Sequence, residues 1–159
     1  MELDYNRIDP ELLPALDNFP GLDITRENIA DIRVMLGSMP AAPSPLTVMQ
    51  EQIMVQSADG EVAVYVYRKS NRDNQPAVLW IHGGGYLFGS AEDERARVIA
   101  DRCDCTVVSV DYRMAPEHPF PAGSNDCYAV LEWMYAQSAQ LSIDKTKIAI
   151  GGASAGSGM

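Results

Sequence analysis

Three short apolar runs, separated by two segments with helical periodicity, place the strongest constraint on the fold of this chain. The runs are AVLWI (77–81), TVVSV (106–110) and KIAI (147–150), and together they are rich in β-branched residues. Continuous runs of this kind are typical of strands in a sheet that is covered on both faces. The order strand, helix, strand, helix, strand predicts right-handed crossovers and an α/β fold with a mostly parallel sheet.

Each intervening segment carries one apolar stripe, as helices packed on the two faces of a sheet require. The first helix is expected after Ser90, where EDERAR is typical of a solvated helix start with acidic residues near the positive end of the dipole. Its stripe is formed by Ala96, Ile99, Ala100 and Cys103. The second helix is expected from about Ala122, with a stripe formed by Cys127, Val130, Leu131 and Met134.

An antiparallel hairpin is predicted before the first of these strands. The segments EQIMVQS (51–57) and EVAVYVYR (61–68) flank Ala58, Asp59 and Gly60. Asp-Gly favours a tight reversal, and the second segment alternates valine with alanine and tyrosine as a strand does.

Residues 1–45 predict short helices and proline-rich connections. Asp9 before Pro10 is suited to begin one helix, and Thr25 to cap another that Gly37 ends. The second helix would present one apolar face, formed by Ile29, Ile32 and Leu36. MPAAPSPL (39–46) is typical of a linker. We therefore expect a helical segment over residues 1–45 and an α/β unit over residues 46–159.

The charge balance argues against a nucleic-acid-binding protein. The 159 residues include 22 acidic and 12 basic side chains, a formal net charge of -10, whereas phosphate binding needs clustered Lys and Arg. The start, MELDYNRIDPELL, lacks the basic and apolar blocks of a secretory signal, and no apolar run approaches membrane-spanning length. The sequence predicts a cytoplasmic protein with no membrane span.

The three cysteines, Cys103, Cys105 and Cys127, have no spacing typical of a disulfide or metal framework. An odd number of cysteines suits a reducing compartment. We expect all three to be buried as small apolar residues, and we expect no metal site.

Two of the predicted strands end in glycine-rich sequences, at the edge of the sheet where α/β proteins collect their chemistry. In WIHGGGYLFGS the three consecutive glycines can adopt backbone conformations that other residues cannot. Their backbone N–H groups can therefore lie close to a ligand without side chains in between. Gly152, Ser154 and Gly156 fit the pattern G-x-S-x-G directly after a strand. This pattern predicts a sharp turn into a helix, with Ser154 on a strained corner and small neighbours required by close packing.

Together the two sequences indicate acyl transfer. A serine that attacks an ester carbonyl creates an oxyanion, and preorganised backbone donors lower the barrier by roughly 10²- to 10³-fold each. The predicted donors are the N–H groups of Gly83, Gly84 and Ala155. The last of these lies at a helix N-terminus, where the dipole favours negative charge.

At these separations HGGGYLFGS (82–90), VVSVDYRMAPEHPFPA (107–122) and GGASAG (151–156) resemble the hormone-sensitive-lipase-like esterases of the α/β-hydrolase fold. The resemblance covers nearly the whole chain. It implies a carboxylesterase or lipase that acts on short- to medium-chain acyl esters without a metal or organic cofactor. It also implies that residues 1–45 form part of a helical cap and that residues 46–159 are the N-terminal half of a catalytic domain.

Carried over by position, the resemblance makes Ser154 the nucleophile and matches Gly83, Gly84 and Ala155 to the oxyanion hole. His82 matches the histidine that shapes the oxyanion loop and does not match the catalytic base, while Gly85, Gly152 and Gly156 are supporting positions. Two departures concern the elbow around the serine: Ala153 stands where many relatives have an acidic residue, and Ser157 where they have a third glycine.

The triad acid and histidine follow the serine in α/β-hydrolases, and only five residues follow Ser154 here. We therefore expect both groups in a missing C-terminal segment or in a second chain, and this chain alone to be inactive. The only histidines are His82 and His118, and His118 lies in a proline-rich loop; neither is expected to act as the base. Without these further residues, the last strand would leave an apolar edge exposed.

Two other classes of function compete with this interpretation. A dinucleotide-binding loop needs G-x-G-x-x-G, which fails at Ala153 or Ser154 depending on the starting glycine. A non-catalytic small-molecule-binding protein on a hydrolase scaffold, as in the gibberellin receptors, stays open, because fold does not establish activity.

Other features have structural explanations beside functional ones. Asp111 and Arg113 are expected to form an ion pair or hydrogen-bond network near the sheet, because buried charges need partners. Tyr86 and Phe88 could line an acyl pocket or simply pack.

Overall fold

The computed structural model describes residues 7–17, 23–38 and 45–159. It divides the chain into two compact units, residues 1–39 and residues 40–159. The linker predicted over residues 39–46 lies mostly outside the described residues. The assignment of residues 1–45 to a cap stays a prediction.

The first unit contains short helices, as the sequence predicts. A 3-10 turn, η2 (Pro10–Leu12), begins after Asp9, whose carboxylate accepts from the backbone N–H of Glu11 at 3.0 Å, and runs into α1 (Leu13–Asp17). The helix α2 (Ile29–Gly37) ends at Gly37 and buries Ile29 and Ile32.

Thr25 does not cap α2, contrary to our expectation. Asn28 stands at the N-cap of the helix, and Thr25 and Asn28 bond each other: Thr25 N–H donates to Asn28 Oδ1 at 2.8 Å, and Asn28 N–H donates to Thr25 Oγ1 at 3.3 Å. Because these bonds close a turn, the helix begins three residues later than the capping pattern predicts.

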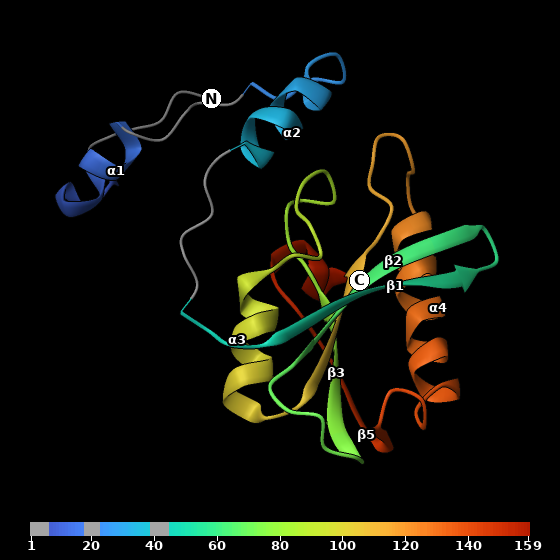
Figure 1. The fold of residues 1–159 in the computed structure, drawn as a ribbon. Helices are drawn as coiled ribbons and strands as arrows, with labels where there is room; N and C mark the ends of the chain where they lie inside the picture. Colours follow the sequence, from blue (N-terminus) through green and yellow to red (C-terminus); the bar gives the residue numbers. More distant parts are fainter. Residues whose placement is uncertain (1–6, 18–22, 39–44) are drawn as a thin grey trace. The chain divides into compact units, whose positions relative to one another are not determined.

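The second unit is built on a five-stranded mixed sheet with the order β1-β2-β4-β3-β5 (Figure 1). The predicted hairpin is formed by β1 (Met49–Ser57) and β2 (Gly60–Arg68), which pair antiparallel in register from Met49↔Arg68 to Ser57↔Gly60. The three predicted apolar runs lie in β3 (Gln75–Ile81), β4 (Thr106–Asp111) and β5 (Ile143–Gly152), which run parallel to one another, while β2 joins β4 antiparallel.

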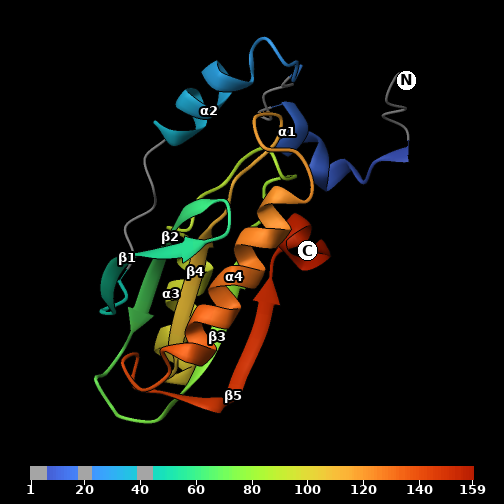
Figure 2. The ribbon, with the colours of Figure 1, turned by 90° about the vertical axis from the view of Figure 1, so that its right-hand side faces the viewer.

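The two predicted helices, α3 (Glu94–Cys103) and α4 (Ala122–Ala136), lie on opposite faces of this sheet (Figures 1 and 2). Valines at alternate positions of β2 and β4 pack on the α4 side with Val130 and Met134 of α4. Tyr67, Trp80 and Val107 point to the other side and pack on Ala96 and Ala100 of α3. The period of two along the strands thus divides the core into two layers.

Two expectations about burial need correction. Cys103 is exposed, because it ends α3 and the chain reverses through Asp104 at a positive φ of 46°, which turns Cys105 into the core in its place. The run KIAI (147–150) was expected in a sheet covered on both faces, but five of the ten positions of β5 are exposed, and Ile150 is 60% exposed. This strand lies at the edge of the described sheet, so the exposed apolar edge that we expected is present.

No helix within the described ranges is long and apolar enough to cross a lipid bilayer. The same residues contain no group of three or more His, Cys, Asp or Glu side chains that could hold a metal ion.

Candidate active site

Strand register brings the two glycine-rich sequences together. Ile81 at the end of β3 is paired with Gly152 at the end of β5, and Ala153 N–H donates to the carbonyl oxygen of Ile81 at 3.1 Å. The oxyanion loop (residues 82–89) and the elbow (residues 152–156) therefore leave the sheet side by side. After β3 the chain continues into β4 on one side of β3, and after β4 it crosses to β5 on the other side. The carboxyl end of β3 is therefore a topological switch point, where α/β proteins bind ligands.

The elbow places Ser154 in a strained backbone conformation. Its φ is 52°, a value that few residues other than glycine adopt. The chain passes there from the extended Ala153 directly into the 3-10 helix η3 (Ser154–Gly158). Ser154 is exposed while Ala155 and Gly156 are buried, so the turn presents the serine outward as the G-x-S-x-G pattern predicts.

The elbow glycines have no room for a side chain. A Cβ on Gly156 would lie 2.1 Å from the carbonyl oxygen of Ile81, and one on Gly152 would lie 2.5 Å from the backbone of Gly156. Both obstacles are backbone atoms, which cannot move aside as a side-chain tip can. The small residues are therefore a steric requirement of bringing the elbow against β3.

The oxyanion loop is compact and depends on glycine conformations. Gly84 and Gly85 have φ values of 122° and 65°, and the N–H of Phe88 donates to the carbonyl of Gly84 at 2.9 Å. A Cβ on Gly83 would lie 2.7 Å from the carbonyl oxygen of Ala153 and 3.4 Å from Cβ of Ser154. The loop is thus in van der Waals contact with the elbow.

The predicted oxyanion donors have no acceptor within the described parts of the chain. This holds for the backbone N–H groups of Gly83, Gly84 and Ala155, and the Ser154 hydroxyl also has no hydrogen-bond partner there. A hollow of about 350 Å³ contains this region, lined among others by His82, Gly83, Gly84 and Ser154. A hollow that is bordered by a serine hydroxyl and by N–H groups without an acceptor in the described chain is suited to a carbonyl substrate.

The sequence model that describes the alpha/beta hydrolase fold matches residues 78–159, which contain both glycine-rich sequences. The chain belongs to this family. It is 35% identical over 156 residues to an arylesterase of Saccharolobus solfataricus, with 94% of this chain and 51% of the relative covered. It is 38% identical over 154 residues to the carboxylesterase NlhH of Mycobacterium tuberculosis, with 94% and 48% covered.

A solved structure titled "Bacterial Heroin Esterase" superposes with a TM-score of 0.82 at 35% identity, covering 97% of this chain and 51% of that chain. The resemblance to the hormone-sensitive-lipase-like carboxylesterases is thereby confirmed, and so is the α/β-hydrolase fold. The chain spans about half the length of the curated relatives it matches.

Within the described chain, neither of the hydrolase's two histidines forms a hydrogen bond with Ser154. His82 is 2% exposed, and its Nδ1 is 2.7 Å from the carbonyl oxygen of Gly83. A carbonyl can only accept, so Nδ1 carries the proton, while the buried Nε2 has no hydrogen-bond partner among the described residues. His118 is exposed in the loop after β4. Neither histidine therefore stands as a base for Ser154, and the catalytic roles of the predicted site residues stay predictions.

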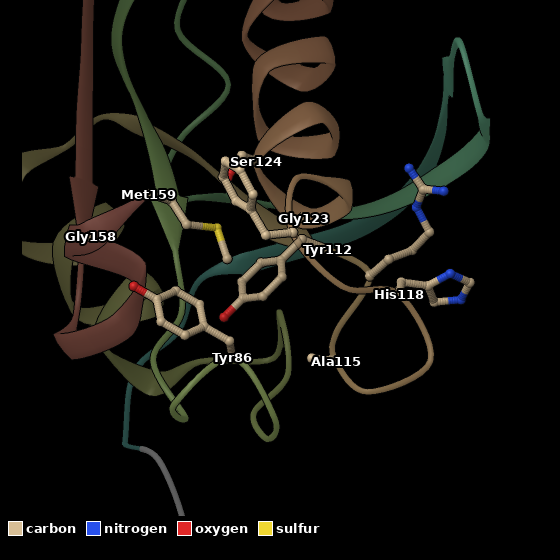
Figure 3. A pocket seen from close by; sticks show the side chains of 10 residues that line it. Tyr86, Tyr112, Ala115, His118, Gly123, Ser124, Gly158 and Met159 are labelled. Atoms are coloured by element: carbon tan, nitrogen blue, oxygen red, sulfur yellow. The ribbon is translucent and has the colours of Figure 1, made fainter.

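A second, smaller cavity of about 140 Å³ lies beside the oxyanion loop (Figure 3). Tyr86, at a positive φ of 64°, points its ring into it, but Phe88 and Ser154 are not among its lining residues. The lining is formed by Tyr86, Tyr112, Arg113, Ala115, His118, Phe120, Gly123, Ser124, Gly158 and Met159. Of the two aromatic candidates for an acyl pocket, Tyr86 therefore borders this cavity and Phe88 does not.

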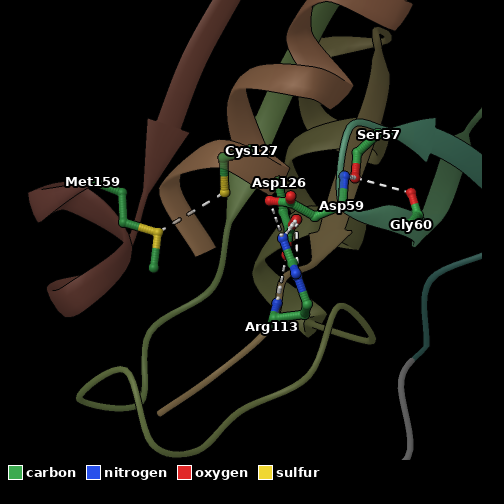
Figure 4. A network of polar contacts seen from close by, with 7 residues as sticks. All are labelled: Ser57, Asp59, Gly60, Arg113, Asp126, Cys127 and Met159. Atoms are coloured by element: carbon green, nitrogen blue, oxygen red, sulfur yellow. Dashed lines mark hydrogen bonds and ion pairs between the residues drawn. The ribbon is translucent and has the colours of Figure 1, made fainter. Parts of the chain in front are cut away.

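Arg113 forms the expected polar network, but its partner is Asp126 rather than Asp111 (Figure 4). Asp126 is fully buried on α4 and accepts from the Arg113 backbone N–H at 2.9 Å and from its guanidinium at 2.7 to 3.1 Å. Asp59 at the hairpin tip accepts from Arg113 Nη2 at 3.2 Å. Hydrogen bonds to Asp126 raise the pKa of the guanidinium. Sequence reasoning missed Asp126, although an acid next to Cys127 in the apolar stripe of a helix is a signal of a buried ion pair.

Proposed function

We propose that this chain is one half of a carboxylic ester hydrolase that acts on short- to medium-chain acyl esters through an acyl-enzyme on Ser154. The single observation that carries the proposal is the elbow: Ser154 stands at a φ of 52°, two residues after Gly152, which pairs with Ile81 directly before the HGGG loop. The names of the relatives, an arylesterase and a carboxylesterase, support ester hydrolysis.

In this mechanism the Ser154 oxygen attacks the ester carbonyl, and the N–H groups of Gly83, Gly84 and Ala155 stabilise the oxyanion. The alcohol then leaves, and water hydrolyses the acyl-enzyme. A serine hydroxyl needs a base to be an effective nucleophile at neutral pH. We propose that the triad acid and histidine are supplied by a further segment or by a second chain, and that the protein acts in the cytoplasm.

Hydrolysis of a short-chain p-nitrophenyl ester tests the proposal. The 159-residue chain is expected to show no turnover above its Ser154→Ala variant, whereas the protein completed by the missing half is expected to turn over the ester and to lose that activity in Ser154→Ala. Turnover by the 159-residue chain that depends on Ser154 would show that His82, His118 or a partner supplies the base. No Ser154-dependent turnover by the completed protein would refute the proposal.

A non-catalytic binding protein on the same scaffold is the second candidate, and it is favoured by the Ser154 hydroxyl, which has no hydrogen-bond partner within the described residues. A fluorophosphonate probe separates the two, because it labels only an activated serine. Labelling of Ser154 in the completed protein supports the hydrolase, and an unlabelled but folded protein supports the binding protein.

A further inference from the structure

Tyr112 contacts His82, the first residue of the oxyanion loop, in two ways. It follows β4 directly, next to β3 in the sheet, and is 2% exposed. Its hydroxyl donates to the backbone carbonyl oxygen of His82 at 3.0 Å. Its ring stacks on the His82 imidazole, with 4.3 Å between ring centroids and 14° between ring planes. Tyr112 thus holds both the main chain and the side chain of the first residue of the loop.

The bonded carbonyl shares a peptide group with a predicted oxyanion donor. The peptide unit is planar and trans, so the C=O of His82 and the N–H of Gly83 point in opposite directions. A hydroxyl that fixes the direction of this carbonyl therefore fixes the direction of the Gly83 N–H. The next peptide is held in the same way, because His82 Nδ1 donates to the carbonyl of Gly83 at 2.7 Å and so orients the N–H of Gly84.

The loop needs such restraints because glycine peptides rotate at little cost. Gly83 and Gly84 have no Cβ to restrict φ and ψ, and Gly84 already occupies a φ of 122°. A rotation of the peptide between His82 and Gly83 would leave the chain path nearly unchanged while turning the donor away from the oxyanion. Tyr112 supplies the one side-chain hydrogen bond to that carbonyl within the described chain.

Tyr112 is itself held firmly. The backbone N–H of the following residue, Arg113, donates to the buried carboxylate of Asp126 at 2.9 Å. The Tyr112 ring packs closely against Gly123 of α4, because a Cβ at Gly123 would lie only 3.1 Å from Cδ2 of Tyr112. Burial raises the pKa of Tyr112 to about 12, so the hydroxyl keeps its proton and remains a donor at neutral pH.

We propose that Tyr112 is a positioning residue that sets the direction of the Gly83 N–H, through the hydrogen bond from its hydroxyl to the carbonyl of His82. This inference rests on the proposed ester hydrolysis, in which that N–H binds the oxyanion. Tyr112 does not contact the reacting atoms and acts only through the peptide plane.

The first test measures peptide orientation and needs no catalysis. Amide N–H residual dipolar couplings are compared in the 159-residue chain and in its Tyr112→Phe and Tyr67→Phe variants. Tyr67 is the matched control, because it is also fully buried and its hydroxyl also donates to a main-chain carbonyl, that of Ala91, at 3.3 Å. We expect the Gly83 coupling to change in Tyr112→Phe and to stay unchanged in Tyr67→Phe. An unchanged Gly83 coupling in folded Tyr112→Phe would overturn the proposal.

A measurement on the unsubstituted chain keeps the proposal testable if Tyr112→Phe does not fold. The hydrogen bond predicts a Tyr112 hydroxyl proton that exchanges slowly with water. A Tyr112 hydroxyl proton that exchanges rapidly in the folded chain would overturn the proposal.

The second test measures kinetics in the completed protein. Removing an oxyanion donor outright costs roughly 10²- to 10³-fold in kcat, so loosening one donor in Tyr112→Phe is expected to lower kcat by about 10- to 100-fold with KM unchanged. Tyr67→Phe is expected to leave both constants unchanged. A Tyr112→Phe effect on KM alone would contradict the positioning role, whereas absence of ester hydrolysis in the unsubstituted protein would refute the proposed function and leave the orientation measurement valid.

Discussion

The carboxylate of Asp126 is expected to contribute far more to stability than the carboxylate of Asp59, although both bind the same guanidinium. Asp126 has no exposed surface, and it accepts bonds from both the backbone and the side chain of Arg113. Asp59 has a side chain that is 54% exposed and accepts one bond, at 3.2 Å. The two variants Asp126→Ala and Asp59→Ala therefore compare a buried and an exposed partner around one arginine.

The magnitudes follow from burial. Removing one partner of a buried ion pair costs about 3–5 kcal/mol, because the other charge is left without compensation. The Arg113 side chain is 26% exposed and keeps Asp59 as a partner, so we expect the low end, about 3 kcal/mol, for Asp126→Ala. An exposed pair contributes about 0–1 kcal/mol, which is the expectation for Asp59→Ala.

Urea unfolding followed by the fluorescence of Trp80 and Trp133 measures both effects. With an m-value of about 2 kcal/mol/M, the expected loss of about 3 kcal/mol lowers the midpoint of Asp126→Ala by about 1.5 M, and Asp59→Ala shifts it by no more than about 0.5 M. Asp126→Asn keeps one acceptor oxygen, so its unfolding midpoint is expected to lie between the midpoints of the two alanine variants. Equal shifts in the two alanine variants would refute the reasoning, because burial would then not decide the strength of the pair.

Two further predictions concern packing and thiol chemistry. Gly156→Ala places a Cβ 2.1 Å from a backbone carbonyl oxygen and is expected to lower the free energy of unfolding by about 1–3 kcal/mol or more. Gly151→Ala, with its nearest contact at 3.4 Å, is expected to change it by less than about 0.5 kcal/mol; equal melting temperatures would contradict the steric argument. At about pH 8 a disulfide reagent is expected to modify Cys103 rapidly and the other two thiols only on unfolding, because the thiolate is the reactive form. Burial raises the pKa of Cys105 to about 11 and of Cys127 to about 12, so their thiolates form only as the pH rises toward these values. More than one rapidly reacting thiol in the folded chain would show that a buried cysteine is accessible.

Local patterns in the sequence predicted most of the architecture. The apolar runs at 77–81 and 106–110 lie in β3 and β4, and the stripe from Cys127 to Met134 lies against the sheet. These features are predictable because the period of burial along a strand or helix depends on neighbouring residues alone. The same holds for the elbow, since a serine between glycines after a strand already implies the strained turn.

The exposure of Cys103 and the start of α2 were not predictable from periodicity. Cys103 shares the helical stripe of Ala96 and Ala100, yet it is exposed because the helix ends there and the chain turns at Asp104. Thr25 has the residue type of a cap, but its bonds with Asn28 close a turn first. In both cases the exact end of an element decides the outcome, and such ends depend on the surrounding structure.

The sequence by itself determined the fold class, the identity of the two glycine-rich loops and their placement at strand ends, because these depend on residue types at short spacing. Only the tertiary structure decided which side chains support the loops. Arg113 pairs with Asp126 and Asp59, which lie 13 and 54 positions away, and Tyr112 reaches a carbonyl 30 positions away. Such contacts arise from strand order and register, which bring the ends of β3, β4 and β5 together. No local sequence pattern specifies which strands become neighbours.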